Sequence, residues 1–347
     1  MYYIENISSK VSNPNRLSAT VVVVAMDRKD FIINAVISAI RSKDLTTNQV
    51  EIAVIKNFKD IKIDEKLTYF GIKHIYSENK GLGHKIIESL EFTSGDFILF
   101  LEDDDLFIDQ KLKRFFDILN IFPFISMYHN SYKNVDFSKN SPRLKKESNP
   151  KNDILIKLRG THELKTAYLA MRSNAMHNLS SMAIRRDVLY SFSDLLKQIT
   201  FSLDHVLFLI SIDSGNPIYI DHSITTQITI HTSASNPPVD AKYIESRINF
   251  LSTSKKELEL CNLYLKSPWA KRVCQTMLLD IEILLEIILP DNNRNKKNGF
   301  FQYLQHSIYK RSLLTMALVC IIPLSKFFNI FNIQPLYLLA KISSIFS

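Results

Sequence analysis

A strand that runs directly into four adjacent carboxylates constrains this chain more than any other segment. Residues 97–105 read FILFLEDDD, so a continuous apolar run ends abruptly in four acidic residues, Glu102 to Asp105. The four negative charges repel one another, and burial beside an apolar strand adds to the cost of keeping them ionised. A hard divalent cation such as Mg²⁺ or Mn²⁺ relieves this cost, because it prefers carboxylate oxygens as ligands. The run therefore predicts either a cation site or a solvated turn after a strand.

The first hundred residues alternate between strand and helix patterns. The apolar runs that read as strands span residues 20–25, 51–55, 72–76 and 97–101. Apolar residues at helical spacing follow the first, the third and the fourth of these runs. This order predicts an α/β fold in which a mostly parallel sheet is flanked by helices.

Polar residues and glycines follow the ends of these strands. Asp27 follows the first strand, Asn57 the second and Gly81 the third, while the acidic run ends the fourth. Ligands of α/β sheets bind at the carboxyl ends of strands, so we expect these groups to converge on one crevice. Asp27, with Asp30 three residues later, is also expected to cap the helix that follows. The Gly81 and Gly83 pair matches neither a dinucleotide fingerprint nor a P-loop.

The composition is that of a globular protein with a sizeable core. Of the 347 residues, 46% are hydrophobic and 22% are charged. The net charge of +8 favours anionic partners such as nucleotides or a phospholipid surface. Nucleic acid is not an expected partner, because the lysines are scattered rather than set in an aromatic-lined stripe. Three widely spaced cysteines and an N-terminus without a signal-peptide pattern favour a reducing, cytoplasmic location.

Four motifs in the first half resemble glycosyltransferase family 2, whose members have the GT-A fold and use nucleotide-diphospho-sugars. The motifs are TVVVVAMDR at 20–28, EIAVIKN at 51–57, NKGLG at 79–83 and GDFILFLEDDD at 95–105. The resemblance implies a GT-A type catalytic domain at 18–236. It divides this domain into a nucleotide-binding half at 18–105 and an acceptor half at 106–236.

The acidic run matches the metal motif of that family. The resemblance implies that Asp104 is the direct ligand of Mn²⁺ or Mg²⁺. Glu102 and Asp103 would contact the sugar, the ribose or metal-bound water, and Asp105 would be structural. The residues that the resemblance assigns to the nucleotide-sugar donor are Ala25, Asp27, Arg28, Asn57, Gly81, Lys85, Glu102 and Asp103.

Two of these residues depart from the family pattern. Asn57 stands where an acidic residue usually reads the base, although its amide can still pair with a base edge because it both donates and accepts. Lys85 is the nearest cation to a position where the family has arginine. These departures leave open a degenerate GT-A module that binds nucleotide-sugar or partners without catalysis. A sugar nucleotidyltransferase is a second alternative, although the segment after the first strand lacks the glycine-rich basic loop of such enzymes.

An aspartate at the start of an apolar helix supplies a second chemical group. Residues 201–209 read FSLDHVLFL, and the resemblance places the catalytic base of an inverting transferase at Asp204. Such a base takes the proton of the acceptor hydroxyl as its oxygen attacks the anomeric carbon. The alternative is an acidic residue that only stabilises the helix N-terminus. At the end of the strand-like run 223–230, His231 would contact the metal or the leaving diphosphate, or be structural.

Two further expectations concern the segment between these groups. Residues 129–153 are rich in Ser, Asn, Lys and Pro, which predicts a loop. Arg185 and Arg186 are candidates to clamp phosphate, or to face solvent from the next helix.

Helical patterns dominate the chain beyond residue 236. Residues 240–266 and 269–289 read as helices. The apolar segments at 312–324 and 327–345 lie near basic residues, which predicts an interfacial or re-entrant membrane anchor, or helices packed on the catalytic domain. We therefore expect residues 237–347 to form a helical C-terminal region associated with a membrane.

Taken with the resemblance, the sequence predicts an inverting, metal-dependent glycosyltransferase of the hexosyl type. The expected donor is a nucleotide-diphospho-sugar, and the expected acceptor is a glycan or a lipid-linked molecule. The expected location is peripheral, at the cytoplasmic face of a membrane.

Overall fold

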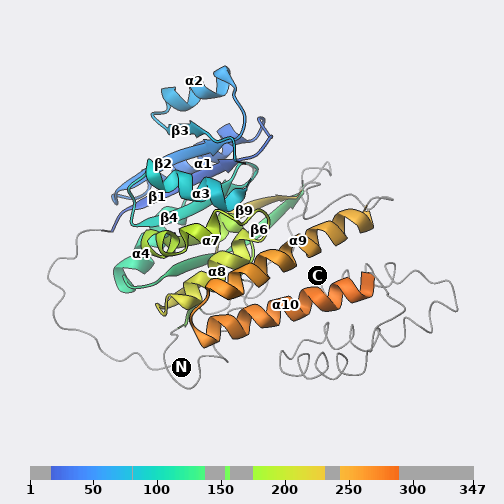
Figure 1. The fold of residues 1–347 in the computed structure, drawn as a ribbon. Coiled ribbons are helices and arrows are strands. Elements are labelled where there is room, and N and C mark those ends of the chain that lie inside the picture. The colour runs from blue at the N-terminus through green and yellow to red at the C-terminus, as the bar shows by residue number, and fades with distance from the viewer. Residues whose placement is uncertain (1–16, 80, 137–152, 157–174, 231–242, 289–347) are drawn as a thin grey trace.

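A single mixed sheet forms the centre of the molecule (Figure 1). The computed structural model describes residues 17–79, 81–136, 153–156, 175–230 and 243–288. The strands are β1 (Ala19–Ala25), β2 (Val50–Lys56), β3 (Lys73–Tyr76), β4 (Phe97–Glu102), β5 (Leu106–Phe107), β6 (Met127–Asp136), β7 (Ile154–Ile156), β8 (Met182–Arg185) and β9 (Ile218–Ile230). Their order across the sheet is β3-β2-β1-β4-β8-β6-β9-β5, and β7 pairs with β9.

Helices connect and cover these strands. The α-helices are α1 (Ile32–Asp44), α2 (Ile61–Tyr69), α3 (Leu82–Glu91), α4 (Lys111–Ile121), α6 (Arg186–Ser191), α7 (Ser193–Leu196), α8 (Leu203–Asp213), α9 (Tyr243–Tyr264) and α10 (Pro268–Ile288). A short 3₁₀ helix, η1 (Leu179–Ser181), precedes β8. The core on one face of the sheet includes α1 and α4, and the core on the other includes α3 and α8.

The four predicted strands are confirmed, and they form the parallel half of the sheet. β1 pairs in parallel with β2 and β4, and β2 pairs in parallel with β3. The run of valines in β1 is buried on both sides. Val21 and Val23 pack in one core, whereas Val22 and Val24 pack in the other. A strand covered on both faces needs apolar residues at every position, so the continuous apolar run correctly predicted a central parallel strand.

The second half of the sheet is mixed. β8 pairs antiparallel with both β4 and β6, while β6 pairs in parallel with β9. The expected loop at 129–153 is therefore wrong over residues 129–136, which belong to β6, and residues 137–152 lie outside the described part. Its polar composition misled the prediction because pairing with β9 supplies the backbone hydrogen bonds that hold β6 in the sheet.

The expected helix cap at Asp27 is also wrong. α1 begins only after Phe31, and no side chain caps its N-terminus. Asp27 instead has a left-handed backbone with φ of 59°, and it bonds to Asn57. No helix was expected at the position of α2, whose N-terminus is capped by the side chain of Asp60.

The two C-terminal helices, α9 and α10, lie side by side and share the core of the sheet (Figure 1). Leu258 and Cys261 of α9, and Val273 and Cys274 of α10, belong to the same apolar cluster as α8. Both helices were predicted. Within the described ranges, no helix is both long enough and apolar enough to cross a bilayer. The apolar segments at 312–324 and 327–345 lie outside these ranges.

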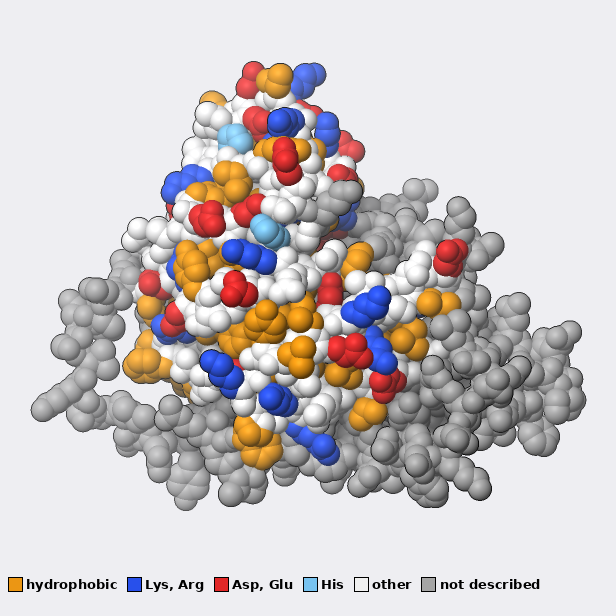
Figure 2. All heavy atoms as spheres, viewed as in Figure 1, with side chains coloured by type: hydrophobic (Ala, Val, Ile, Leu, Met, Phe, Trp, Pro, Cys, Tyr) orange, Lys and Arg blue, Asp and Glu red, His pale blue; other side chains and the backbone are white. Residues whose placement is uncertain are grey.

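The visible surface carries charges of both signs. Figure 2 shows Lys and Arg side chains interspersed with Asp and Glu on this face, and hydrophobic side chains gathered near its middle. In the part of the chain that is described, this face therefore has a mixed electrostatic character rather than one basic stripe.

Candidate functional site

The acidic run folds back onto the end of the neighbouring strand. Val24 of β1 and Glu102 of β4 are paired in register. The backbone N–H of Asp103 donates to the Val24 carbonyl at 3.2 Å, and the backbone N–H of Met26 donates to the Asp103 carboxylate at 3.2 Å. The Asp103 side chain therefore lies beside the residues that follow β1.

Arg28 lies directly against this run. Its guanidinium donates to the Asp103 carboxylate at 2.5 Å and to the Asp104 carboxylate at 2.5 Å. The Asp103 side chain is fully buried, whereas the Arg28 side chain is one-third exposed, at 33%. Arg28, predicted to bind the donor, thus places a positive charge at the point where the donor diphosphate and metal were expected.

Burial makes three carboxyl groups of the run hold protons more strongly than usual. Desolvation raises the pKa of Asp103 to about 6, against the opposing effect of Arg28. Desolvation likewise raises the pKa of Asp105 to about 7. Burial, followed by the nearby charges of Asp105 and Asp104, raises the pKa of Glu102 well above its usual value. A divalent cation favours the ionised forms of such groups, so this set of donors fits one.

The described residues do not enclose a metal ion by themselves. No group of three or more His, Cys, Asp or Glu side chains among them is arranged to hold one. Mg²⁺ is usually bound by one or two carboxylates together with substrate phosphates and waters, so two protein ligands would suffice. Asp104 stays the predicted ligand, and His231 lies outside the described residues.

Asp27 and Asn57 join the ends of β1 and β2. The backbone N–H of Asp27 donates to the Asn57 side-chain oxygen at 2.9 Å, and the Asn57 amide nitrogen donates back to the Asp27 carboxylate at 3.0 Å. The backbone N–H of Asn57 also donates to the Ala25 carbonyl at 3.3 Å. These three predicted donor-binding residues therefore form one hydrogen-bonded unit.

In the loop that contains Gly81 and Gly83, packing explains one of the two glycines. The backbone N–H of Gly83 donates to the Ile199 carbonyl at 3.0 Å, and a Cβ atom at Gly83 would lie only 2.1 Å from the Leu196 carbonyl oxygen. A Cβ at Gly81 would lie 3.4 Å from its nearest neighbour, an ordinary contact. Gly83 is thus required for packing between α3 and the turn that precedes α8. The donor-binding role of Gly81 stays a prediction.

Lys85 is a buried cation near this loop. Its ammonium donates to the Asn79 carbonyl at 2.5 Å. Burial lowers the pKa of Lys85, and the charges of Glu88 and Asp27 oppose that shift. Lys85 is therefore close enough to Asp27 to share the electrostatic field of the site.

Asp204, the predicted base, lies in the first turn of α8 and within electrostatic reach of Glu102. The negative charge of Asp204 adds to the causes that raise the pKa of Glu102, after burial, Asp105 and Asp104. Burial alone would raise the pKa of Asp204, but the charges of His205 and His177 outweigh it, and the pKa is lowered. Asp204 is therefore an ionised carboxylate at neutral pH, as a base must be.

Three histidines near Asp204 had no role in the sequence interpretation. His205 Nδ1 lies 3.2 Å from the Asp204 carboxylate, and the His205 backbone N–H donates to the same oxygen at 2.9 Å. The ring of His177 packs edge-on against that of His205, with centroids 5.2 Å apart. A ring nitrogen of His129 lies 2.9 Å from the His177 carbonyl. No sequence signal joins these residues, because they come from β6, α8 and the turn before η1.

Lys111 is a further residue near the site that the sequence did not single out. It is fully buried, and its ammonium donates to Asn130 Oδ1 at 2.7 Å, the Ser180 carbonyl at 2.7 Å and Thr226 Oγ1 at 2.9 Å. Burial lowers its pKa well below the usual value, while Asp105 opposes that shift. Lys111 therefore ties α4, β6, η1 and β9 together next to the acidic run.

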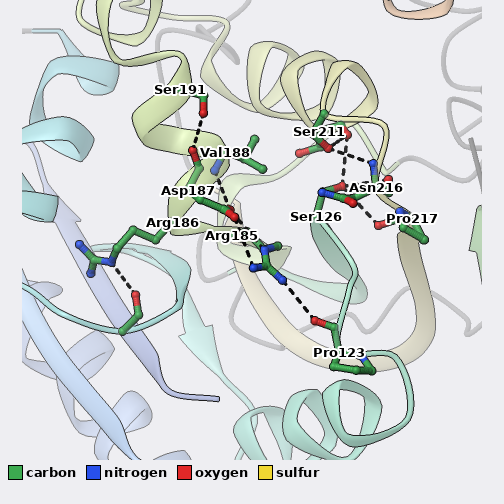
Figure 3. A network of polar contacts seen from close by, with 12 residues as sticks. Pro123, Ser126, Arg185, Arg186, Asp187, Val188, Ser191, Ser211, Asn216 and Pro217 are labelled. Atoms are coloured by element: carbon green, nitrogen blue, oxygen red, sulfur yellow. Dashed lines mark hydrogen bonds and ion pairs between the residues drawn. The ribbon is translucent and has the colours of Figure 1, made fainter. Parts of the chain in front are cut away.

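Arg185 and Arg186 do not lie at the phosphate site. Figure 3 shows Arg185 between Asp187 and the Pro123 carbonyl, to which it donates at 3.2 Å. Arg186 donates to the Gly95 carbonyl at 2.6 Å. Gly95 precedes β4, and Arg185 is paired in register with Phe97, the first residue of β4, so both arginines lie at the end of this strand opposite the acidic run. The expected phosphate clamp is wrong, because both side chains satisfy backbone carbonyls instead.

Residues 20–189 match the family model for Glycosyl transferase family 2. This segment belongs to glycosyltransferase family 2. The matched region contains β1 to β8, including the acidic run and Arg28, so the family resemblance of the four motifs is confirmed. No curated protein is similar enough in sequence to this chain to count as a relative.

Solved GT-A glycosyltransferases share the fold. S. aureus TarS in complex with UDP-GlcNAc is 14% identical, with a TM-score of 0.54 over 89% of this chain and 86% of that one. The mannosyltransferase PcManGT from Pyrobaculum calidifontis, in complex with GDP-Man and Mn²⁺, is 13% identical, with a TM-score of 0.53 over 93% of this chain and 85% of that one. At these identities the likeness establishes the fold alone. The chain therefore has a GT-A-like fold, and its residues 20–189 match the model of glycosyltransferase family 2.

Proposed function

We propose that this protein is an inverting, metal-dependent glycosyltransferase of the hexosyl type that moves a sugar from a nucleotide-diphospho-sugar to a glycan or lipid-linked acceptor. One observation carries the proposal: within the segment that matches glycosyltransferase family 2, the acidic run at the end of β4 lies against Arg28, the residue that follows β1 by three positions. Asp204, in the first turn of α8, is the proposed base. An inverting transfer needs one base beside the donor and no carboxylate nucleophile.

Each charged side chain of the site has a separate proposed role. When bound, Mn²⁺ or Mg²⁺ would supply a positive charge for the leaving diphosphate. Asp104 is proposed to hold the metal, together with His231. Arg28, beside Asp103 and Asp104, would bind the diphosphate as an additional cation. Asp204 would take the acceptor proton.

The donor side of the site is proposed to lie along the ends of β1 and β2. Asn57, held by Asp27, would present its amide to the edge of the base. UDP-GlcNAc and GDP-mannose, which the two compared structures contain, are the first donors to test.

Turnover of nucleotide-sugars tests this proposal. The purified chain with Mn²⁺ should release UDP or GDP from at least one of these two donors, more rapidly with a suitable glycan acceptor. In Asp104→Asn, Mn²⁺ should no longer increase the rate of turnover. In Asp204→Asn, kcat should fall about 100-fold or more. Lys113→Met, an exposed change on α4, serves as the control. Unchanged turnover in Asp204→Asn would contradict the assignment of the base.

A non-catalytic GT-A module is the second candidate. Its support is that Arg28 pairs with Asp103 and Asp104, where a metal was expected. Calorimetry with UDP and Mn²⁺ separates the two: binding without any turnover of nucleotide-sugars would favour the module, whereas binding with turnover would favour the enzyme.

We also propose a peripheral location at the cytoplasmic face of a membrane. The support is the sequence alone, since residues 312–324 and 327–345 are apolar and lie near basic residues. Co-sedimentation of the full chain with anionic phospholipid vesicles, but not with neutral ones, is the expected result. Equal recovery in the supernatant with both would contradict it.

A further inference from the structure

Glu257, on the C-terminal helix α9, binds the turn that leads into the helix of Asp204. Its side-chain oxygens accept hydrogen bonds from the backbone N–H groups of Thr200 at 2.6 Å, Phe201 at 3.1 and 3.2 Å, and Ser202 at 2.8 Å. Glu257 is buried, with 6% exposed. Burial of a carboxylate costs free energy unless the group is hydrogen-bonded, so the Glu257 carboxylate depends on its bonds to the turn.

The contact lies at the N-terminus of α8, where the usual side-chain cap is missing. Ser202 is the N-cap of α8, yet its own side chain makes no capping bond. The Glu257 carboxylate binds the N–H groups of the turn and of the N-cap Ser202, where the positive end of the helix dipole also favours a negative charge. Asp204 is the second residue of α8, two positions after Ser202, so its backbone position depends on this turn.

Two more contacts restrict α8 and the turn. On the side of α3, Gly83 donates to the Ile199 carbonyl at 3.0 Å. At the far end of α8, the Asp213 carboxylate accepts from the backbone N–H groups of Lys266 at 2.8 Å and Ser267 at 2.6 Å, in the connection between α9 and α10. The C-terminal helices therefore hold both ends of the helix that carries Asp204.

We propose that Glu257 is a positioning residue for the base Asp204, through its contact with the turn before α8. This inference rests on the proposed function. A base must lie within hydrogen-bond reach of the proton that it takes, and a misplacement of about 1 Å can cost about 100-fold in rate. By fixing the N–H groups of residues 200–202, Glu257 sets where the first turn of α8 begins.

The test compares Glu257→Gln with Glu259→Gln. Glu259 is on the same helix and pairs on the surface with Lys255 at 3.8 Å. In Glu257→Gln an amide N–H₂ replaces one acceptor and faces a backbone N–H donor. We expect kcat for transfer to fall about 10- to 100-fold while KM for the donor changes less than about 2-fold. The control should keep both values. Glu257→Asp, which retains the charge on a shorter side chain, should have an intermediate kcat even if Glu257→Gln folds poorly.

Two readouts separate positioning from a general loss of stability. Amide hydrogen exchange at residues 200–202 should become faster in Glu257→Gln and not in Glu259→Gln. In an Asp204→Asn background, Glu257→Gln should cause no further loss of the residual transfer rate, because there is no base left to position. A merely structural role would lower the residual rate in both backgrounds.

Wild-type kcat in Glu257→Gln, or an equal loss in the Asp204→Asn background, would overturn the positioning role alone. The absence of transfer by the wild-type chain from UDP-GlcNAc, GDP-mannose and a wider panel of nucleotide-sugars would overturn the proposed function and the positioning role with it. The exchange experiment does not need turnover, so it still reports whether Glu257 holds the turn.

Discussion

The guanidinium of Arg28 donates to the Asp103 carboxylate at 2.5 Å and thereby joins the segment after β1 to the acidic end of β4. The pair is asymmetric, because Asp103 is fully buried while Arg28 is partly open to solvent. Because the Arg28 guanidinium is partly exposed, it can turn from Asp103 toward a bound ligand. We therefore expect Arg28 to contact the donor diphosphate.

Arg28→Ala should therefore lower the free energy of unfolding and weaken the binding of the donor. Loss of the partner leaves the buried Asp103 carboxylate with the Met26 N–H as its remaining donor among the described residues, which should cost about 1–3 kcal/mol of unfolding free energy. KM for the donor should rise at least about 10-fold if Arg28 also contacts the diphosphate. Urea unfolding and steady-state kinetics measure the two effects, with exposed Arg41→Ala on α1 as the control. A normal KM with reduced stability would mean that Arg28 only neutralises the acidic run.

The pair of Asp204 and His205 should give stability a pH window. The pKa of Asp204 is lowered in the folded state, so its contribution is present above its unfolded pKa near 3.8 and is lost as the pH falls through the folded value. The pKa of His205 is raised, so its contribution is present below 6.5 and is lost as the pH rises through the folded value. The stabilisation by the ion pair should be largest between these limits.

Thermal unfolding of His205→Gln measures this window. The difference in Tm between wild type and His205→Gln should be largest near pH 5 to 6 and should shrink toward pH 9. His74→Gln, at the sheet edge in β3, is the matched control. A Tm difference that does not change with pH would show that His205 acts through packing alone.

Gly83→Ala should destabilise the protein more than Gly81→Ala. A Cβ at Gly83 meets the Leu196 carbonyl at 2.1 Å, so the backbone must move, at a cost of about 1–3 kcal/mol. At Gly81 the φ of −70° and the 3.4 Å spacing accept alanine with little strain. Urea unfolding of the two variants gives the comparison. Equal stabilities would mean that the turn after α7 shifts freely away from α3.

Lys111→Met should be among the most damaging single changes near the site. Methionine keeps much of the volume but leaves the buried acceptors on Asn130, Ser180 and Thr226 without their donor, which should cost about 2–4 kcal/mol. Lys113→Met, exposed on the same helix, should have almost no effect. Chemical denaturation compares the two variants, and a similar stability for both would show that these acceptors find other donors.

The first half of the fold was predictable because each element reports its own surroundings. The valines of β1 and residues 97–101 of β4 are apolar at every position, as a strand buried on both faces must be. The candidate site was predictable for the same reason, since polar residues at the ends of parallel strands meet at one edge of the sheet. β6 escaped prediction because its polar residues are held by pairing with β9, which no local pattern shows.

The sequence by itself determined the parallel half of the sheet, the acidic run at its edge and the helical character of residues 243–288. Only the tertiary structure decided which partner each charged group has. Arg28 pairs with Asp103, Asp27 hydrogen-bonds to Asn57 instead of capping a helix, Lys111 is buried, and Glu257 binds the turn before the helix of Asp204. Periodicity records whether a position faces the core, because burial constrains each residue separately. Hydrogen bonds and ion pairs depend on two groups far apart in the chain, and only folding brings them within reach.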